Sequence, residues 1–383
     1  MIKICSRCVM DSSIPEIKFS TKNYCNYCEE FLKVYSYQKN DNINVQRKQK
    51  LSKFIKDAKN VGKDKAYDCV VGLSGGVDSA WTLIKVIQSG LRPLAVHMDN
   101  GWNSELAQNN ISNLVAQLEI DLYTHVIDWE EYRELMQCFF DANVVDIELL
   151  YDNAFIAVLY QQAYKFGLKH VVAGTNSSTE GMSMPKNWNW FKLDKKNIKD
   201  IAKIRNVKIK TMPTIGVKFW FYCEYIKRIK WVSFPEYFDY KKNEATNLLI
   251  KDFSFKPYPY KHYESIFTRF YQGYILPNKF NIDKRKLHLS NLIITSQITR
   301  EEALKELNKI PYPSKKELNE DIDYFLKKMN WSKDKLKNYL NIPREEHNKF
   351  KSEKWLYEYL YKNLQKMVPK NLSKYLKNSY AIK

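Results

Sequence analysis

The feature that most constrains this chain is a short glycine turn between a strand pattern and a helix pattern. The apolar run of residues 67–73 predicts a buried strand, and residues 80–84 begin a helical pattern. Between them the sequence reads Ser74-Gly75-Gly76-Val77-Asp78-Ser79. Glycines let backbone N–H groups approach an anion, serines add hydroxyl donors, and the helix presents its positive N-terminus. The segment therefore predicts a phosphate-binding loop.

This hexapeptide resembles the PP-loop of the ATP pyrophosphatases. No lysine follows the glycines, so it is not a Walker-type loop that reaches the terminal phosphates of ATP. PP-loop enzymes cleave ATP to AMP and adenylate an oxygen of their substrate, and a nitrogen or sulfur nucleophile then displaces AMP. The resemblance implies ATP as cofactor, and Mg²⁺ is expected because it neutralises a leaving pyrophosphate. The alternative is a strand-to-helix turn that binds no ligand.

Length and net charge limit the number of domains and the classes of partner that this chain can have. A chain of 383 residues predicts two or three domains. No window is apolar enough to cross a bilayer, and cysteines and polar residues stand where a signal peptide would be, so we expect a cytoplasmic protein without membrane contact. The net charge of +19 favours a nucleic-acid partner. Most of the excess is lysine in a chain rich in Asn, Ile and Tyr, and phosphate-bearing small substrates also favour a positive surface. Charge alone does not decide between these partners, and because composition can account for the charge we do not expect nucleic acid to be one.

Four of the seven cysteines form two Cys-x-x-Cys pairs near the N-terminus: Cys5, Cys8, Cys25 and Cys28. Their spacing suits a four-cysteine zinc site, and thiolate or metal chemistry is expected before disulfides in a reducing compartment. Four thiolates leave no open position for catalysis. We therefore expect structural Zn²⁺ in a ribbon, with an iron–sulfur cluster and a redox dithiol as the alternatives.

The chain divides into four segments. Residues 1–35 predict the zinc ribbon, and residues 36–66, rich in Lys, Asn and Gln, predict a helical connection. Residues 67–215 alternate short apolar runs with helix-period segments. This pattern predicts an α/β, Rossmann-like PP-loop domain with a parallel sheet covered by helices on both faces. Residues 216–383 predict a mainly helical region for substrate or partner, ending in an amphipathic helix.

We expect four strands, at residues 68–73, 94–98, 122–127 and 170–173. We expect helices at residues 78–88, 104–118, 129–140 and 153–166. Thr299 is expected to cap a further helix that continues through Glu301 and Glu302. Ligands of parallel sheets bind at the carboxyl ends of the strands, so the residues that follow each strand are the candidates for a nucleotide site.

The end of the second strand reads His97-Met98-Asp99. In PP-loop enzymes this strand end passes beside adenine, so the resemblance implies that backbone groups of His97 and Met98 contact the base. Asp99 could contact ribose or a metal-bound phosphate. The alternative is that Asp99 caps the helix expected from Ser104.

The segment after the fourth strand contains Gly174, Thr175 and Asn176. Small residues there would let the backbone approach the nucleotide. Related enzymes often carry acidic residues here that hold Mg²⁺, and this chain supplies Glu180. Asp78 is a second magnesium candidate, with capping of the helix after the loop as its alternative.

A third cluster contains His262, Glu264 and Arg269. Loose helical spacing would bring them near one face, where they could bind an acidic sugar or transfer protons. A surface charge network is the alternative.

At this point the chain resembles the N-acetyl sugar amidotransferases, a PP-loop family of bacterial surface-polysaccharide pathways. The resemblance covers most of the chain. The cysteine pairs and the PP-loop are shared widely among PP-loop proteins. The segments that point to this family are residues 174–176, 179–181, 263–265, 267–274, 283–286, 288–290 and 299–303.

The family implies an amidine synthesis for lipopolysaccharide O-antigen or capsule. ATP adenylates the acetamido oxygen of a nucleotide-linked N-acetyl sugar, ammonia attacks the activated carbon, and AMP leaves. Catalytic roles are expected for Asp78, His262, Glu264 and Arg269. Diacetamido uronic acids and nonulosonic acids both remain open as the sugar, and Arg269 or lysines could hold the carboxylate of either.

The ammonia must come from solution or from a partner. An N-terminal-nucleophile glutaminase needs Cys where this chain has Ile2, and Cys69, Cys138 and Cys223 have no glycine-rich elbow. The resemblance implies a glutaminase subunit related to that of imidazole glycerol phosphate synthase, in some cases with a cyclase-like subunit.

The strongest alternative enzyme is a PP-loop tRNA thiolation enzyme, which the basic charge favours. Such enzymes commonly need further catalytic cysteines, whereas the three remaining cysteines are isolated. A non-catalytic scaffold of a polysaccharide-synthesis complex is the alternative of another class.

Overall fold

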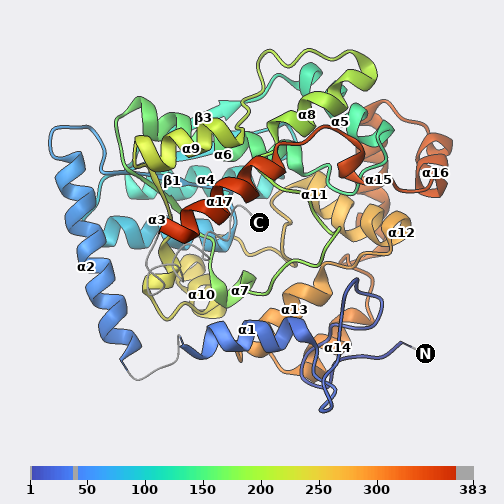
Figure 1. The fold of residues 1–383 in the computed structure, drawn as a ribbon, viewed down its shortest axis with the longest axis horizontal. Coiled ribbons are helices and arrows are strands. Elements are labelled where there is room, and N and C mark those ends of the chain that lie inside the picture. The colour runs from blue at the N-terminus through green and yellow to red at the C-terminus, as the bar shows by residue number, and fades with distance from the viewer. Residues whose placement is uncertain (1, 38–41, 368–383) are drawn as a thin grey trace.

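The computed structural model describes residues 2–37 and 42–367 (Figure 1). At its centre lies a sheet with the order β3-β2-β1-β4-β5, in which all neighbouring strands run parallel. The strands are β1 (Cys69–Gly72), β2 (Pro93–Asp99), β3 (Leu122–Val126), β4 (His170–Ala173) and β5 (Lys230–Ser233). The four predicted strands are confirmed, and β5 is an additional edge strand that was not predicted.

The strand order reverses between β1 and β4, which are neighbours although β2 and β3 lie between them in sequence. Val70 of β1 pairs with Leu94 of β2 on one side and with Val171 of β4 on the other. In open parallel sheets, ligands bind at such a switch point, outside the carboxyl ends of the strands. Two of the predicted nucleotide-binding segments, residues 74–79 and 174–176, begin here.

Helices cover both faces of the sheet. They include α2 (Ile43–Gly62), α3 (Val77–Gln88), α4 (Glu105–Leu118), α5 (Trp129–Asp141) and α6 (Leu149–Lys165). Successive residues of a strand point to opposite faces. Val71 therefore packs with α2, α3 and α4, whereas Val70 packs with α5 and α6. The four helices predicted for this part are confirmed, although α6 begins at Leu149 rather than at residue 153.

The chain beyond β5 is mainly helical, as predicted. Its helices are α10 (Lys242–Phe253), α11 (Ile266–Phe270), α12 (Leu276–Phe280), α13 (Arg285–Ile294), α14 (Arg300–Leu307), α15 (Lys315–Met329), α16 (Lys333–Asn341) and α17 (Lys354–Met367). Thr299 caps α14 in a capping box with Glu302, which confirms that prediction. Residues 368–383, the end of the predicted amphipathic helix, lie outside the described residues.

Between β4 and α10 the chain forms shorter elements. These are α7 (Ser177–Glu180), α8 (Lys195–Ala202), α9 (Val217–Phe221) and a π-helical segment, Tyr222–Ile226. The ring of Tyr357 in α17 lies 5.3 Å from that of Trp220 in α9, so α17 packs on this region. Within residues 2–37 and 42–367, no helix is both long and apolar enough to span a bilayer.

The N-terminal residues and α1 (Asn26–Tyr37) lie beside α13 and α14 (Figure 1). The Arg300 guanidinium of α14 donates to the backbone carbonyls of Cys5 and Cys8 at 3.0 and 3.1 Å. Ser290 of α13 accepts a hydrogen bond from the Val9 N–H at 3.1 Å. The N-terminal unit is therefore fixed to the helices of the C-terminal region.

Candidate functional site

The predicted phosphate loop follows β1 directly and leads into α3. Gly75 has φ of +89°, a left-handed conformation that glycine adopts without strain. The hydroxyls of Ser74 and Ser79 lie 3.1 Å apart and close the loop. The Gly75 carbonyl accepts a hydrogen bond from the Tyr258 hydroxyl at 2.8 Å. The loop thus has the strand–turn–helix context that an anion cradle needs.

Two glycines in this region lie at points of close approach, and at Gly174 the neighbouring atoms belong to the backbone. A Cβ at position 76 would overlap the Glu264 carboxylate. A Cβ at position 174 would lie 2.7 Å from the backbone carbonyl carbon of Asp78. The absence of side chains at these positions therefore lets the PP-loop, the segment after β4 and the segment around Glu264 meet at one place.

Asp78 is held from two sides at the start of α3. Its Oδ1 accepts a short hydrogen bond from the Tyr240 hydroxyl, and its Oδ2 accepts one from the Thr179 hydroxyl at 3.2 Å. The N-cap position of α3 belongs to Gly76, so Asp78 does not cap the helix. Its carboxylate is oriented by residues of two other segments.

Glu180, at the end of α7, forms an ion pair with Lys261 at 2.5 Å. The ammonium charge of Lys261 holds the pKa of the Glu180 carboxyl below its usual range. Carboxylate oxygens are the ligands that Mg²⁺ prefers, and the donor chemistry of Asp78 and Glu180 suits that ion. In this structure the positive charge beside the Glu180 carboxylate is the Lys261 ammonium.

Three carboxylates and two ammonium groups interact electrostatically around the PP-loop. They belong to Asp78, Glu180, Glu264, Lys242 and Lys261. Burial raises the pKa of the Glu264 carboxyl. Burial lowers the pKa of the Lys242 ammonium, whereas the neighbouring carboxylates raise that of Lys261.

Two histidines lie close to this group. Burial and nearby lysines, with Lys261 first among them, move the pKa values of His262 and His288 well below the usual value. Both imidazoles are therefore neutral near pH 7. His262 has φ of +67°, a strained conformation for a residue with a side chain. The Nδ1 of His288 is buried and has no hydrogen-bond partner among the described residues.

Arg269 lies outside this cluster. Its guanidinium forms a two-point ion pair with buried Asp321, with both N–O distances at 2.6 Å, and lies 5.1 Å from the centre of the Tyr263 ring. Helical spacing does not apply to the predicted trio, because His262 and Glu264 precede the first residue of α11. The structure thus brings Glu264 and His262 to the PP-loop region and places Arg269 in a bridge between α11 and α15.

The side chains at the end of β2 have internal partners. The His97 ring lies between the Leu73 carbonyl, at 2.8 Å, and the Asn103 amide, at 3.0 Å. Met98 is fully buried. Asp99 accepts from the Gly101 N–H at 2.7 Å, whereas Ser104 is the cap of α4. Contacts of His97 and Met98 with adenine would therefore have to come from the backbone, as the resemblance implies.

The side chains after β4 are also engaged. Asn176 caps α7 by accepting from the Thr179 N–H at 2.9 Å, and its amide donates to the Gly174 carbonyl at 3.0 Å. The Thr175 hydroxyl lies 2.8 Å from that of Ser233 in β5. These bonds shape the segment and leave the approach to a nucleotide to its backbone.

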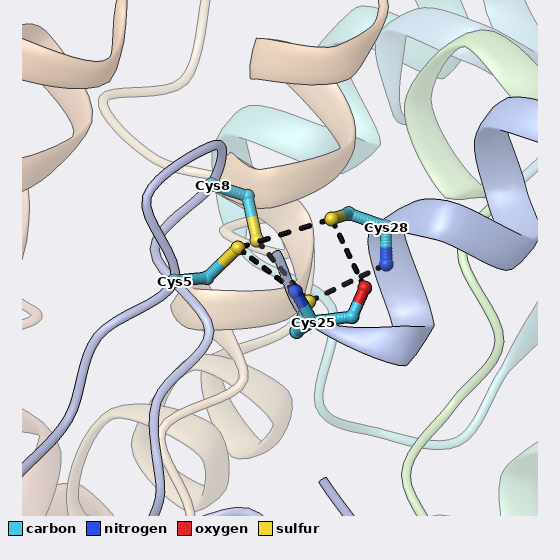
Figure 2. Close-up of side chains that lie close together, drawn as sticks. All are labelled: Cys5, Cys8, Cys25 and Cys28. Carbon is cyan, nitrogen blue, oxygen red and sulfur yellow. Dashed lines mark hydrogen bonds between the residues drawn. The ribbon is translucent and has the colours of Figure 1, made fainter. Parts of the chain in front are cut away.

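The four N-terminal cysteines converge in a separate centre. Figure 2 shows Cys5 and Cys8 on one loop and Cys25 and Cys28 at the start of α1. All four are fully buried, and their sulfur atoms lie within 4.8 Å of one another. The Cys5–Cys28 and Cys8–Cys25 sulfur distances are 3.8 and 3.6 Å.

These distances fit a tetrahedral metal ion. Zinc–sulfur bonds of about 2.3 Å place neighbouring sulfurs about 3.8 Å apart. The Cys25 N–H donates to the sulfur of Cys5 at 3.2 Å, and the Arg7 guanidinium lies 4.0 Å from that of Cys28. Both contacts stabilise negative charge on sulfur. The cluster can therefore hold a metal ion such as Zn²⁺.

The three remaining cysteines are buried in secondary structure. Burial raises the pKa of the Cys138 and Cys223 thiols to about 11 and raises that of Cys69 as well. Thiols rather than thiolates are therefore present at neutral pH. None of the three has the environment of a reactive cysteine.

Four residues near this site were not predicted from the sequence as site residues: Lys242, Lys261, Tyr240 and His288. Local spacing could not indicate them, because their partners Asp78 and Glu180 lie on distant segments of the chain. Two signals were present: Lys261 is adjacent to His262 in a candidate segment, and His288 lies in residues 288–290, one of the segments that carry the family resemblance. Lys242 carries no comparable motif.

Two families match parts of the chain. Residues 48–184 match NAD synthase, and residues 264–366 match the family described as "LPS biosynthesis protein WbpG-like, C-terminal domain". The first match contains the PP-loop and the second begins at Glu264. No curated protein matches the chain.

Several solved structures match parts of the chain at low TM-scores. NMN synthetase from Francisella tularensis is 16% identical. The match covers 48% of this chain and 95% of the synthetase, with a TM-score of 0.29. NH3-dependent NAD synthetase from Campylobacter jejuni is 19% identical. The match covers 42% of this chain and 74% of the synthetase, with a TM-score of 0.27. The U34-tRNA thiolase NcsA from Methanococcus maripaludis is 14% identical. The match covers 81% of this chain and 90% of the thiolase, with a TM-score of 0.32. Likenesses at these scores carry no argument about function.

Proposed function

We propose a function for this chain on the premise that it belongs to the PP-loop amidotransferases related to lipopolysaccharide biosynthesis, the family that its two domain matches support. In our proposal it replaces the acetamido oxygen of a nucleotide-linked N-acetyl sugar with nitrogen from ammonia, for O-antigen or capsule. The observation that carries the proposal is the approach of Glu264 to Gly76, because it joins the WbpG-like part to the phosphate loop.

The proposed reaction has two steps. The acetamido oxygen attacks the α-phosphorus of ATP, the bond from that phosphorus to the bridging oxygen breaks, and pyrophosphate leaves with the electron pair while the amide nitrogen loses its proton. Ammonia then adds to the activated carbon, the carbon–oxygen bond breaks, and AMP leaves with the former acetamido oxygen. Adenylation is needed because the oxygen of an amide is a poor leaving group. Holding both reactants together would supply much of the rate.

The residues of the cluster suit these steps. Glu264, whose pKa is raised by burial, and neutral His262 are groups able to accept a proton from the attacking ammonia. Asp78 and Glu180 would hold Mg²⁺, which supplies charge neutralisation for the leaving pyrophosphate. Arg269 would act as a positioning residue, because it packs on Tyr263 between His262 and Glu264.

The partners in this proposal follow from the resemblance. A glutaminase subunit like that of imidazole glycerol phosphate synthase would supply ammonia, with or without a cyclase-like subunit. The cysteine centre would hold structural Zn²⁺ and fix the N-terminal unit to α13 and α14. Cytoplasmic sugar nucleotides would be the substrates.

The test is AMP formation by purified protein with Mg-ATP, ammonium and a panel of nucleotide-linked diacetamido sugars. We expect ammonium-dependent AMP with one sugar, together with the mass decrease of about one unit that exchange of O for NH produces. A parallel reaction contains bulk tRNA and a sulfur donor. AMP formed with tRNA alone would replace this proposal with tRNA thiolation, although the three remaining cysteines are buried and protonated.

A further inference from the structure

We propose that Lys242, with Lys261 beside it, binds the phosphates of ATP at the PP-loop and stabilises the leaving pyrophosphate. This assignment rests on the ATP-dependent function proposed above and adds the source of positive charge. The PP-loop itself offers N–H and hydroxyl donors but no cationic side chain. Departure of pyrophosphate concentrates negative charge, so cations placed beforehand at that position stabilise the transition state.

The backbone of Lys242 is fixed next to the PP-loop. Lys242 is the first residue of α10, which packs against α3. Two residues earlier, the Tyr240 ring packs on Trp81 of α3 at 4.9 Å, and its hydroxyl bonds to Asp78. The Lys242 N–H donates to Gln297 at 3.0 Å, and the Gln297 amide donates to the Ser178 carbonyl of α7 at 2.8 Å.

These contacts place Lys242 beside the helices that follow both strands of the switch point. α3 follows β1, and α7 follows β4. A polyphosphate bound at the PP-loop lies at this position in an open parallel sheet. The ammonium of Lys242 is at the end of a flexible four-carbon stem, which lets it adjust to the position of a bound phosphate.

The Lys242 ammonium has no hydrogen bond or ion pair of its own within the described part of the chain. Its charged neighbours, at longer range, are Asp78, Glu180, Glu264 and Lys261. The side chain is half-buried, and removing an unpaired charge from water is costly. The N-terminus of α10 disfavours a cation further, because the positive end of the helix dipole lies there. A bound polyanion would offset both costs.

Lys261, unlike Lys242, forms an ion pair among the described residues. It is mostly buried, and its ion pair with Glu180 fixes its position at the end of α7. Burial lowers the pKa of Lys242, and the positive charge of Lys261 lowers it further. One fixed and one unpaired cation together suit a ligand with several negative charges. Inorganic pyrophosphate carries the charge pattern of the leaving group and serves as the probe.

The experiment measures binding of pyrophosphate and of α,β-methylene-ATP, each with Mg²⁺, by titration calorimetry. The variants are Lys242→Gln and Lys242→Arg. The matched control is Lys241→Gln, because Lys241 is adjacent, exposed and paired with Glu244 at 2.9 Å. We expect the dissociation constant of both ligands to rise about 10- to 100-fold in Lys242→Gln, from the loss of a charge-assisted bond. It should stay within about threefold of wild type in Lys242→Arg and in the control.

Three results would overturn the assignment. They are equal affinity in wild type and Lys242→Gln, no binding of either ligand to wild type, and a rise in the KM for the sugar with phosphate binding unchanged. If Lys242→Gln does not fold, Lys242→Met replaces it as the neutral variant. The proposed function fails separately: if no sugar supports AMP formation while pyrophosphate binding still depends on Lys242, the amidotransferase proposal is wrong and this assignment stands.

Discussion

At the scale of single residues, the orientation of Asp78 depends on two hydroxyl groups, those of Tyr240 and Thr179. Burial raises the pKa of Tyr240, so its hydroxyl stays protonated and donates at neutral pH. Tyr240→Phe keeps the ring against Trp81 but removes this donor. We expect Mg²⁺-dependent binding of α,β-methylene-ATP to weaken about five- to tenfold, less than the loss of a direct bond to the ligand, because the Tyr240 hydroxyl acts through Asp78. Titration calorimetry measures it.

Tyr237→Phe is the control for this prediction. Its ring packs on Phe54 and Phe234, 5.7 Å from each, on the same side of the sheet. Removing its hydroxyl should leave nucleotide affinity unchanged. If Tyr240→Phe binds the analogue as tightly as wild type, the Tyr240 hydroxyl has no part in positioning Asp78 for the ligand.

Single residues also differ in whether their place in the site can be predicted from the sequence. The hexapeptide at residues 74–79 was predictable, because an anion loop is made by consecutive residues with local conformational needs. Tyr240 bonds to Asp78, and Lys242 lies in a helix that packs on α3; both placements depend on long-range packing, which no local pattern encodes. Arg269 was grouped with His262 by helical spacing, but His262 lies in a strained turn before α11 begins.

At the scale of elements, α13 fixes the position of α7. The Asn291 side chain is 1% exposed, accepts from the Met182 N–H at 2.9 Å, and donates to the Ser177 and Ser178 carbonyls at 3.2 and 2.8 Å. Asn291→Ala leaves the Met182 N–H without its partner, whereas the Ser177 carbonyl keeps the bond from the Gly181 N–H and the Ser178 carbonyl keeps its bonds from Thr295 and Gln297. We expect a loss of about 1–3 kcal/mol in the free energy of unfolding. Urea denaturation monitored by circular dichroism measures it.

A matched control is Asn341→Ala, in which an exposed asparagine at the end of α16 loses one bond to the Lys337 carbonyl. Its unfolding free energy should change by less than about 0.5 kcal/mol. Because α7 carries Glu180, Asn291→Ala should also weaken binding of the ATP analogue. Unchanged stability in Asn291→Ala would contradict a structural role for the bond between Asn291 and the Met182 N–H.

The elements themselves were predictable to different degrees. The central strands are short apolar runs bounded by turn residues, and β1 and β4 are buried along their whole length, so their pattern is clear. The edge strand β5 reads Lys-Trp-Val-Ser and starts with an exposed lysine, so nothing marks it as part of a sheet. The π-helical segments, Tyr222–Ile226 and Tyr271–Ile275, likewise have no sequence signature.

At the scale of the whole molecule, all six histidines of the chain share one electrostatic property. Burial is the main cause that moves each of their pKa values below the usual value of about 6.5. His347 is the clearest case: burial lowers its pKa to about 3. Its ring nitrogens bond to the Asn197 carbonyl oxygen at 2.8 Å and to the Asp146 N–H at 3.2 Å, an arrangement that needs the neutral ring.

The stability of the fold should therefore fall on mild acidification. Below about pH 6.5 the histidines of the unfolded chain bind protons, whereas those of the folded chain stay neutral until their lower pKa values are reached. The unfolded state then holds more protons, and the free energy of unfolding falls as pH falls. Each histidine contributes up to about 1.4 kcal/mol per pH unit in this window. For His347 the window extends from about pH 6.5 to about pH 3.

Urea denaturation at pH 7.5, 6.5 and 5.5 tests this expectation. Most carboxylates remain ionised in this range, so histidines dominate the change, but protonation of metal-binding thiolates would add to it. His347→Gln separates the two contributions, because it removes one histidine and leaves the cysteines in place. The wild type should lose several kcal/mol between pH 7.5 and 5.5, and the variant should lose about 1 kcal/mol less over the same interval. Equal slopes for the two proteins would show that His347 is protonated in the folded state, in conflict with its buried position.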